Sequence, residues 1–286
     1  MRTENRIVLG DNLDVAPALP DESFQMVYVD PPFNTGKPQV RRTLATEQDG
    51  TASRVGFGGR RYRSQLLAES SYRDEFADYL AFLEPRLRHA HRLLTASGTL
   101  YFHIDYREAH YCKLLLDEIF GRANFLNEII WAYDYGGRSK RRWPAKHDTI
   151  LVYVKDESAY YFDAEEVDRE PYMAPGLVTP DKAARGKMPT DVWWHTIVPT
   201  NGREKTGYPT QKPEGILRRM VLASTRPGDA CLDLFAGSGS LGAVAAKTGR
   251  RYVLIDISEE AVRVATKRLA EIHAADAQRR AAALFS

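Results

Sequence analysis

The sequence predicts an α/β protein with a mostly parallel, twisted sheet and helices on both faces. Strand-like and helix-like patterns alternate at both ends of the chain, which is typical of a parallel sheet. Several short apolar runs end in Asp or Gly turns, and helical repeats follow them. The chain has 286 residues, enough for one large domain or for one domain with an insertion.

The N-terminal part begins with two predicted strands. Residues 6–9 form a short strand that ends at Gly10-Asp11-Asn12, a turn that can start a helix. Residues 26–29 form a buried strand that stops at Asp30-Pro31-Pro32-Phe33, because two prolines cannot join a central ladder. Residues 34–70 show little periodicity, and we expect a long loop that is functional or disordered.

Helical spacing of apolar residues then predicts a helix from about residue 76 to 94. Ser71-Tyr72-Arg73-Asp74 resembles a capping box ahead of it, and Pro85 should kink or divide it. Further elements expected in the middle of the chain are a strand over 99–104, a helix over 107–120, and strands over 125–133, 149–154 and 160–162.

The C-terminal part returns to strict alternation after an irregular stretch over 163–208. Pro213 suits the first turn of a helix that runs to about Ser224. The remaining expected elements are a strand over 230–235, a Gly-rich loop over 236–239 that opens a helix, a strand over 252–255, and a last helix capped by Ser258. We therefore divide the chain into residues 1–123, with a mobile basic loop at 34–70, an insertion over 124–208, and residues 209–286.

Composition excludes some functions and leaves others open. The net charge of +2 argues neither for nor against nucleic acid, but basic residues gather in two runs, 37–63 and 138–146. Such runs are either solvated loops or a phosphate-binding face. The two cysteines have no metal or disulfide spacing, so we expect no metal and a reducing compartment. We find no signal peptide and no run of membrane-spanning length.

The loop Asp30-Pro31-Pro32-Phe33 is the first candidate site. It lies at the carboxyl end of a strand, where open α/β sheets place their ligands. It offers a carboxylate, backbone carbonyls next to prolines that have no N–H, and an aromatic ring. These groups suit a flat ligand that carries an amino group, although the same tetrapeptide also forms ordinary turns.

The loop Asp233 to Gly239 is the second candidate site. Gly237 and Gly239 let the backbone approach a ligand, and the following helix N-terminus offers free N–H groups. Asp256 ends the next strand, where its carboxylate can accept from ribose hydroxyls. Because Gly242 completes a Gly-x-Gly-x-x-Gly pattern, a nicotinamide-dependent oxidoreductase is an alternative.

The two sites together resemble the β-class of S-adenosylmethionine-dependent DNA amino-methyltransferases, in which the catalytic motif precedes the cofactor motif. The resemblance spans residues 6–272. It is carried, in order, by Gly10-Asp11, Asp30-Pro31-Pro32-Phe33-Asn34-Thr35-Gly36, Phe102-His103-Ile104-Asp105, Asp191-Val192-Trp193, Tyr208-Pro209-Thr210-Gln211-Lys212-Pro213, the Asp233 loop and Asp256. It implies a Rossmann-like methyltransferase fold with permuted motif order and an inserted target-recognition region at 124–208.

The resemblance also implies roles for individual residues. Asp30 and the Pro31 carbonyl should accept from the target amino group, within a loop that Pro32 stiffens, and Phe33 should stack on an extruded base. The residues expected to hold S-adenosyl-L-methionine are Asp11, Thr210, Lys212, Asp233, Phe235, Gly237, Gly239, Asp256 and Ile257. Trp193, His103 and Asp105 are expected in the core or behind the site.

Double-stranded DNA is the partner that the resemblance implies. The candidate DNA contacts are Arg41, Arg42, Arg138, Lys140, Arg141 and Arg142. Asp at the first motif position favours N6 of adenine over N4 of cytosine. RNA or protein-amide methylation, and a non-catalytic nucleic-acid module, are more remote alternatives. We expect a bacterial cytoplasmic location, while dimerisation and a cognate restriction endonuclease stay open.

Overall fold

The computed structural model describes residues 4–35, 39–48, 54–55, 61–72, 74, 76–136, 139–199 and 201–283. The chain divides into two compact units: Pro32–Tyr79 is the smaller, and Met1–Pro31 together with Leu80–Ser286 is the larger. In the described residues, no helix has the length and apolar character that crossing a bilayer requires.

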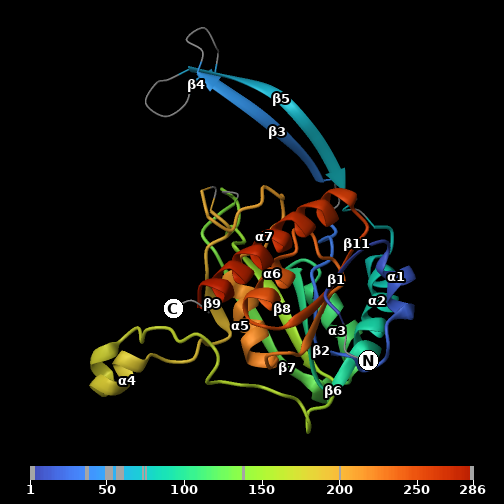
Figure 1. The fold of residues 1–286 in the computed structure, drawn as a ribbon, viewed down its shortest axis with the longest axis vertical. Coiled ribbons are helices and arrows are strands. Elements are labelled where there is room, and N and C mark those ends of the chain that lie inside the picture. Colours follow the sequence, from blue (N-terminus) through green and yellow to red (C-terminus); the bar gives the residue numbers. More distant parts are fainter. Residues whose placement is uncertain are drawn as a thin grey trace. The chain divides into compact units, whose positions relative to one another are not determined.

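The larger unit is built on a mixed, mostly parallel sheet (Figure 1). Its described strands lie in the order β1-β11-β10-β2-β6-β8-β7-β9. They are β1 (Arg6–Leu9), β2 (Phe24–Val29), β6 (Leu94–Asp105), β7 (Phe125–Ala132), β8 (His147–Val154), β9 (Val192–Trp194), β10 (Ala230–Asp233) and β11 (Arg251–Asp256). Strand β8 runs antiparallel to both of its neighbours, and the other pairs in this sheet are parallel. The predicted fold class is confirmed.

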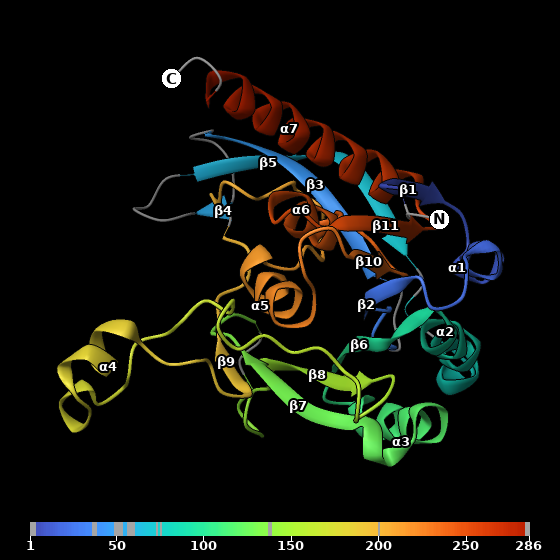
Figure 2. The same cartoon turned by 60° about the horizontal axis from the view of Figure 1, so that its bottom comes forward.

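Helices cover both faces of this sheet. Figure 2 shows α5, α6 and α7 on one side of it and α2 and α3 on the other. The helices are α1 (Asn12–Val15), α2 (Tyr79–Leu93), α3 (Ala109–Phe120), α4 (Pro180–Arg185), α5 (Glu214–Ser224), α6 (Ser240–Lys247) and α7 (Glu259–Ala283). Pro213 is the N-cap of α5, and the Ser258 hydroxyl accepts from Ala261 N at 3.3 Å in the first turn of α7, as the sequence predicts.

The main core lies between the sheet and α5. Side chains of β2, β6, β7, β8 and β10 meet the apolar side of α5 and α6 there; examples are Met26, Tyr101, Ile150, Ile216, Met220 and Leu241. Burying such a side chain stabilises the fold by about 1.5–3 kcal/mol relative to leaving it exposed. This packing makes the strand ends a rigid frame for the loops that follow them.

The carboxyl edge of the sheet gathers the chain's acidic strand ends. Asp233 pairs with Leu254 of β11 on one side and with Tyr28 of β2 on the other. Asp256 and Asp30 therefore each lie two residues beyond a direct partner of Asp233. Because β8 is reversed, its first residues, and the last residues of β7 and β9, lie at this same edge.

The smaller unit contains a long antiparallel pair of strands. They are β3 (Gln39–Gln48) and β5 (Arg61–Tyr72), and the short β4 (Arg54–Val55) pairs with β5. The ladder runs from Gln39 opposite Tyr72 to Gln48 opposite Tyr62. The expectation of an irregular loop over 34–70 was therefore wrong for the described residues. Antiparallel pairing satisfies this backbone without the apolar alternation that a buried strand shows.

Two smaller expectations were also wrong, and a third was wrong in part. The helix begins at Tyr79, beyond the expected capping box over residues 71–74, and Asp74 of that motif instead accepts a hydrogen bond from the Thr35 hydroxyl. Pro85 lies inside α2 without dividing it, while a kink there stays a prediction, and the buried Leu83 and Leu87 hold the helix against the core on either side. Residues 160–162 form no strand.

The region 124–208 is not separate from the sheet. It contributes the strands β7, β8 and β9 to the main sheet. The division of the chain at residues 124 and 208 stays a prediction. The parts outside the sheet are residues 133–146, 155–191 and 195–208, of which residues 137, 138 and 200 are outside the described ranges. A role of this region in target recognition stays a prediction.

Candidate active site

Asp30 forms a close ion pair directly after β2. Lys212 Nζ donates to Asp30 Oδ1 at 2.8 Å and to Oδ2 at 2.6 Å. The Lys212 side chain is only 12% exposed and the Asp30 side chain only 13%. Contact with both oxygens fixes the carboxylate plane, so this pair sets the direction in which Asp30 can accept further hydrogen bonds.

The backbone of Lys212 is held by the first residue of α6, directly after the glycine loop. The Ser240 hydroxyl donates to the Lys212 carbonyl at 2.9 Å. The neighbouring Gln211 accepts from Thr206 N at 2.8 Å and donates to the Glu204 carbonyl at 2.7 Å. The loop before α5 is therefore folded onto itself and onto the start of α6. The pairing of Lys212 with Asp30 was not predicted from the sequence.

The glycine loop between β10 and α6 requires its glycines. Gly237 and Gly239 have φ of 50° and 71°, a left-handed conformation that costs other residues free energy. A Cβ on Gly239 would lie 2.8 Å from Ala265 Cβ of α7, and one on Gly237 would lie 3.2 Å from the Tyr208 ring. The loop backbone is therefore packed against α7 and against the segment that carries Lys212.

Asp256 binds the glycine loop directly. Its Oδ2 accepts from Gly237 N at 2.7 Å, and its Oδ1 accepts from Ser258 N at 2.9 Å. Burial raises the pKa of this carboxyl, while the backbone N–H groups act in the opposite direction. The next residue, Ile257, is 71% exposed, which leaves its side chain available to a ligand beside Asp256.

Asp233 is a buried carboxylate beneath the same loop, only 2% exposed. Burial raises its pKa well above the usual range, and the charges of Asp30 and Asp256 raise it further, against the backbone N–H of Phe235 and the charge of Lys212. Phe235 N donates to Oδ1 at 3.0 Å, and Oδ2 has no hydrogen-bond partner among the described residues. The site thus holds an acid that a nearby cation would stabilise in its ionised form.

Asp11 is the N-cap of α1 and also pairs with an arginine. It accepts from Leu13 N at 2.9 Å and from Arg86 Nη2 at 3.1 Å. The Arg86 guanidinium carbon lies 3.9 Å from the centre of the Phe82 ring, and this ring lies 6.1 Å from the ring of Phe235. A chain of contacts therefore links Asp11 to the glycine loop.

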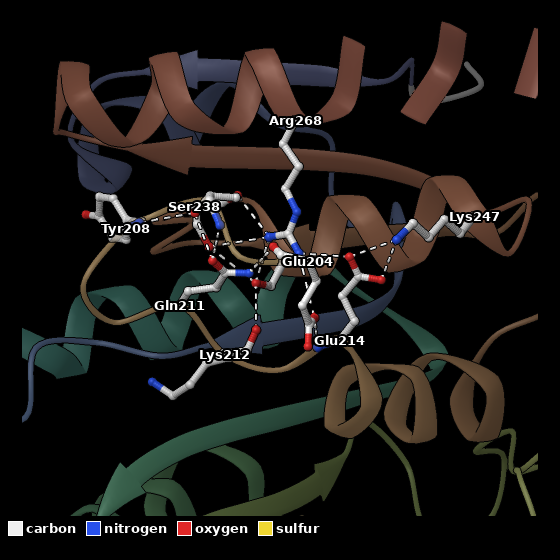
Figure 3. A network of polar contacts seen from close by, with 10 residues as sticks. Glu204, Tyr208, Gln211, Lys212, Glu214, Ser238, Lys247 and Arg268 are labelled. Atoms are coloured by element: carbon white, nitrogen blue, oxygen red, sulfur yellow. Dashed lines mark hydrogen bonds and ion pairs between the residues drawn. The ribbon is translucent and has the colours of Figure 1, made fainter. Parts of the chain in front are cut away.

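An arginine that the sequence analysis missed ties these segments together. Arg268 of α7 is only 7% exposed; it donates to Ser240 Oγ at 3.0 Å, to the Ser238 carbonyl at 3.2 Å and to Glu214 Oε1 at 2.8 Å. Figure 3 shows its guanidinium between the glycine loop and the acids Glu204 and Glu214. An arginine within the apolar stripe of a predicted helix was the available signal.

A second polar chain is buried behind Asp30. The Tyr28 hydroxyl lies 2.8 Å from His103 Nδ1, and His103 Nε2 lies 3.2 Å from Asp148 Oδ2. Burial alone would raise the pKa of the Asp148 carboxyl, but hydrogen bonds from His103 and Tyr133 and the charges of His103 and Lys212 bring it below the usual value. Asp105 and Trp193 are buried as well, so the expectation of core positions for His103, Asp105 and Trp193 is confirmed.

The other predicted site residues divide among different places. Pro32 and Phe33 belong to the smaller unit, where the Pro32 carbonyl accepts from the Tyr79 hydroxyl at 2.6 Å. Thr210 is exposed, as are Lys140, Arg141 and Arg142. Arg41 and Arg42 fall on β3, and Arg138 lies outside the described residues. The roles of all these residues stay predictions.

The sequence matches the DNA methylase family N6_N4_Mtase over residues 24–267. It is 31% identical over 271 residues to the DNA adenine methyltransferase YhdJ of Escherichia coli, which covers 92% of this chain and 82% of that protein. It is 28% identical over 266 residues to the type II methyltransferase M.HpaI of Haemophilus parainfluenzae, covering 93% of this chain and 74% of the other.

Solved structures show the same fold. The cytosine-N4-specific PvuII DNA methyltransferase superimposes with a TM-score of 0.64 at 15% identity, over 94% of this chain and 87% of that one. The M1.HpyAVI–SAM complex gives a TM-score of 0.58 at 19% identity, over 92% and 98%. These likenesses confirm the expected Rossmann-like architecture.

Proposed function

The chain belongs to the DNA methylase family N6_N4_Mtase, and we propose that it transfers a methyl group from S-adenosyl-L-methionine to N6 of adenine in double-stranded DNA. The observation that carries the proposal is the placement of Asp30. Its strand β2 lies beside β10, which leads into the glycine loop, and its ion-pair partner Lys212 is bound to the start of α6. Acceptor and cofactor loop therefore share one edge of the sheet.

The residues of the glycine loop fit the methyl donor. When bound, S-adenosyl-L-methionine supplies a methyl group activated by a positively charged sulfur. Asp233, buried and with Oδ2 unpaired among the described residues, suits the amino-acid ammonium. We assign the ribose hydroxyls to Asp256, because each of its oxygens accepts a backbone N–H and has a second lone pair. The exposed side chain of Ile257 suits the flat adenine ring of the donor.

Asp30 and the Pro31 carbonyl would prepare the target nitrogen. The lone pair of an exocyclic base amine is delocalised into the ring, which makes it a poor nucleophile. Two acceptors on its N–H bonds favour a tetrahedral nitrogen whose lone pair points at the methyl carbon. Positive charge develops on that nitrogen during transfer, and the Asp30 carboxylate stabilises it. The proton then leaves to water, so Asp30 need not be a strong base.

Lys212 supports this role by holding Asp30. Each carboxylate oxygen can accept from the ammonium and still accept from a second donor. The pairing therefore leaves Asp30 able to bind an amine N–H while preventing rotation of its side chain. The sequence-based expectation that Lys212 lies near the donor carboxylate stays a prediction.

The choice of adenine rests on two supports. Asp at the first motif position is the residue that the resemblance associates with adenine N6, and the similar protein YhdJ is named a DNA adenine methyltransferase. The geometry of Asp30 itself would serve either amine. We further propose a bacterial cytoplasmic enzyme, with a cognate restriction endonuclease and dimerisation left to experiment.

Tritiated S-adenosyl-L-methionine, offered with duplex DNA, RNA or protein as separate acceptors, tests the reaction. We expect label in duplex DNA alone. Mapping modified bases in DNA from expressing cells should then give N6-methyladenine within a fixed sequence. N4-methylcytosine would contradict the choice of base, and label confined to RNA or protein would overturn the proposal.

A further inference from the structure

The loop between β7 and β8 leaves the sheet at the edge that carries Asp30. Asp148, at the start of β8, lies opposite Asp105 of β6 and Trp131 of β7. The charge of Lys212, the partner of Asp30, also acts on Asp148. The described residues of this loop, 133–136 and 139–146, therefore begin and end at the same edge of the sheet as Asp30, with β6 between β2 and β8.

Three contacts pin the base of this loop. Tyr133 N donates to the Lys146 carbonyl at 3.0 Å, and the Lys146 ammonium lies 2.6 Å from Asp134 Oδ1. The Tyr133 hydroxyl donates to Asp148 Oδ1 at 3.0 Å. These bonds fix the two strands at the point where they leave the sheet, so the loop projects from a rigid base.

The part of the loop that we call the tip, residues 139–143, presents an exposed indole next to three cations. Ser139 Oγ accepts from the backbone N of both Arg141 and Arg142 at 3.2 Å, which turns the chain there. Trp143 follows and is 94% exposed. The proline after it, Pro144, disfavours helical backbone geometry at Trp143. Lys140, Arg141 and Arg142 are exposed as well, and residues 139–146 contain no acid.

Resting on the proposed DNA methylation, we propose that Trp143 enters the base stack beside the target nucleotide and fills the space from which that base is extruded. Cations on the same tip match the phosphates that flank such a gap, whereas a protein partner would need acidic residues opposite them. Apolar side chains that enter between base steps are a known means of opening a duplex, and a base pulled from its stack leaves an aromatic-sized space.

The test uses two duplexes with the mapped recognition sequence. One has 2-aminopurine at the target position, whose fluorescence rises on extrusion, and the other keeps the target adenine, on which the methylation rate is measured because 2-aminopurine has no amino group at C6. Trp143→Ala should lower the fluorescence rise and the methylation rate by about 10-fold or more, as expected for the loss of one ring–base stack. Trp143→Phe should recover most of both. On a duplex whose target base is mispaired, the defect of Trp143→Ala should largely disappear, because less energy is needed for extrusion.

Several results would overturn the inference. Wild-type fluorescence and rates in Trp143→Ala would remove it, and an equal loss on paired and mispaired duplexes would make the ring an ordinary groove contact. Unchanged Tm and donor affinity should show that Trp143→Ala folds, as expected for so exposed a side chain. Failure of the wild-type protein to methylate any DNA is a separate result, which overturns the proposed function itself.

Discussion

Lys212 gives Asp30 a fixed direction, and this defines what loss of the carboxylate should do. Asp30→Ala removes the acceptor that meets positive charge on the target nitrogen, so the methylation rate at saturating donor should fall by at least about 100-fold. The Kd for S-adenosyl-L-methionine should stay nearly unchanged, because the glycine loop keeps its own contacts. Single-turnover methylation and equilibrium dialysis separate the two quantities, and a parallel loss of donor binding would contradict the assigned role.

Asp233 predicts a dependence of stability on pH. Its pKa in the folded protein is raised, chiefly by burial, so the folded state binds this proton more tightly than the unfolded chain does. The resulting stabilisation is complete at pH values below the pKa of the unfolded chain, about 3.9. It is lost as the pH rises through the pKa of the folded protein. Asp233→Asn cannot ionise and keeps an oxygen for Phe235 N.

We therefore expect Asp233→Asn to have a higher Tm than the wild-type protein near neutral pH, with a difference that shrinks towards about pH 4. Thermal unfolding of both proteins across this range measures it. Donor affinity should fall, since the substituted side chain cannot pair with an ammonium. A Tm difference that does not change with pH would show that the carboxyl is not the titrating group.

At the scale of elements, Gly239 of the glycine loop has two reasons to be glycine: its left-handed backbone and the close approach of α7. Their costs can be measured separately. Gly239→Ala adds a strained left-handed alanine and a methyl group 2.8 Å from Ala265 Cβ. Gly228 also has a positive φ of 87°, but its added methyl would meet nothing within 4 Å. Gly228→Ala should lower the free energy of unfolding by about 1–2 kcal/mol, and Gly239→Ala by about 1–3 kcal/mol more. Urea unfolding gives both values, and equal losses would mean that the overlap relaxes freely.

Arg268 connects α7 with the glycine loop and with α5, and its contribution to stability can be measured. Arg268→Met removes a buried partner of Glu214 and two loop contacts, and should lower the free energy of unfolding by about 3 kcal/mol. Lys247 pairs with the same carboxylate from an exposed position, so Lys247→Met is the matched control, with a loss below about 1 kcal/mol. Similar losses in the two variants would show that burial of the arginine is not what matters.

Elements with a buried face could be predicted from the sequence, and those formed by mutual pairing could not. Residues 24–29 and 230–233 are buried along their length, and their apolar runs mark them. Strands β3 and β5 depend on each other's backbone, and neither Gln39–Gln48 nor Arg61–Tyr72 carries a regular apolar alternation. The sequence likewise showed β7 and β8 as strands, but their membership of the main sheet depends on pairing partners that lie far along the chain.

The residues of the candidate site also fall into a group that the sequence could predict and a group that it could not. Strand-end residues such as Asp30, Asp233 and Asp256 could be predicted, because their places follow from where apolar runs stop. Partners brought in by tertiary packing could not: the position of Arg268 in an apolar stripe marked it as buried, but neither its partner Glu214 nor the pairing of Lys212 with Asp30 has a local signal. Such contacts join residues far apart along the chain and exist only once the whole sheet has formed.

At the scale of the whole molecule, the sheet places a basic tip at the edge that carries Asp30, and this predicts how DNA affinity responds to salt. Replacing Arg141 and Arg142 together by Ala should weaken binding and lower the slope of log K against log salt concentration by about 2, if each meets one phosphate. Arg279 and Arg280 are also exposed, near the end of α7, and pair with Asp276.

Substituting Arg279 and Arg280 by Ala is therefore the control, and it should leave the slope unchanged. Titrations by fluorescence anisotropy at several salt concentrations measure both pairs of substitutions. If the Arg141 and Arg142 variant also kept the wild-type slope, the tip would face solvent and not DNA.

The pinned base of the β7–β8 loop has a consequence for its outer residues. Since Tyr133, Lys146 and Asp148 close the loop where it meets the sheet, its outer residues can vary in length and chemistry without disturbing the scaffold beneath. A change in the chemistry of these outer residues should therefore alter the proposed contact with DNA, while Asp30, Asp233 and Asp256 keep their places at the strand ends.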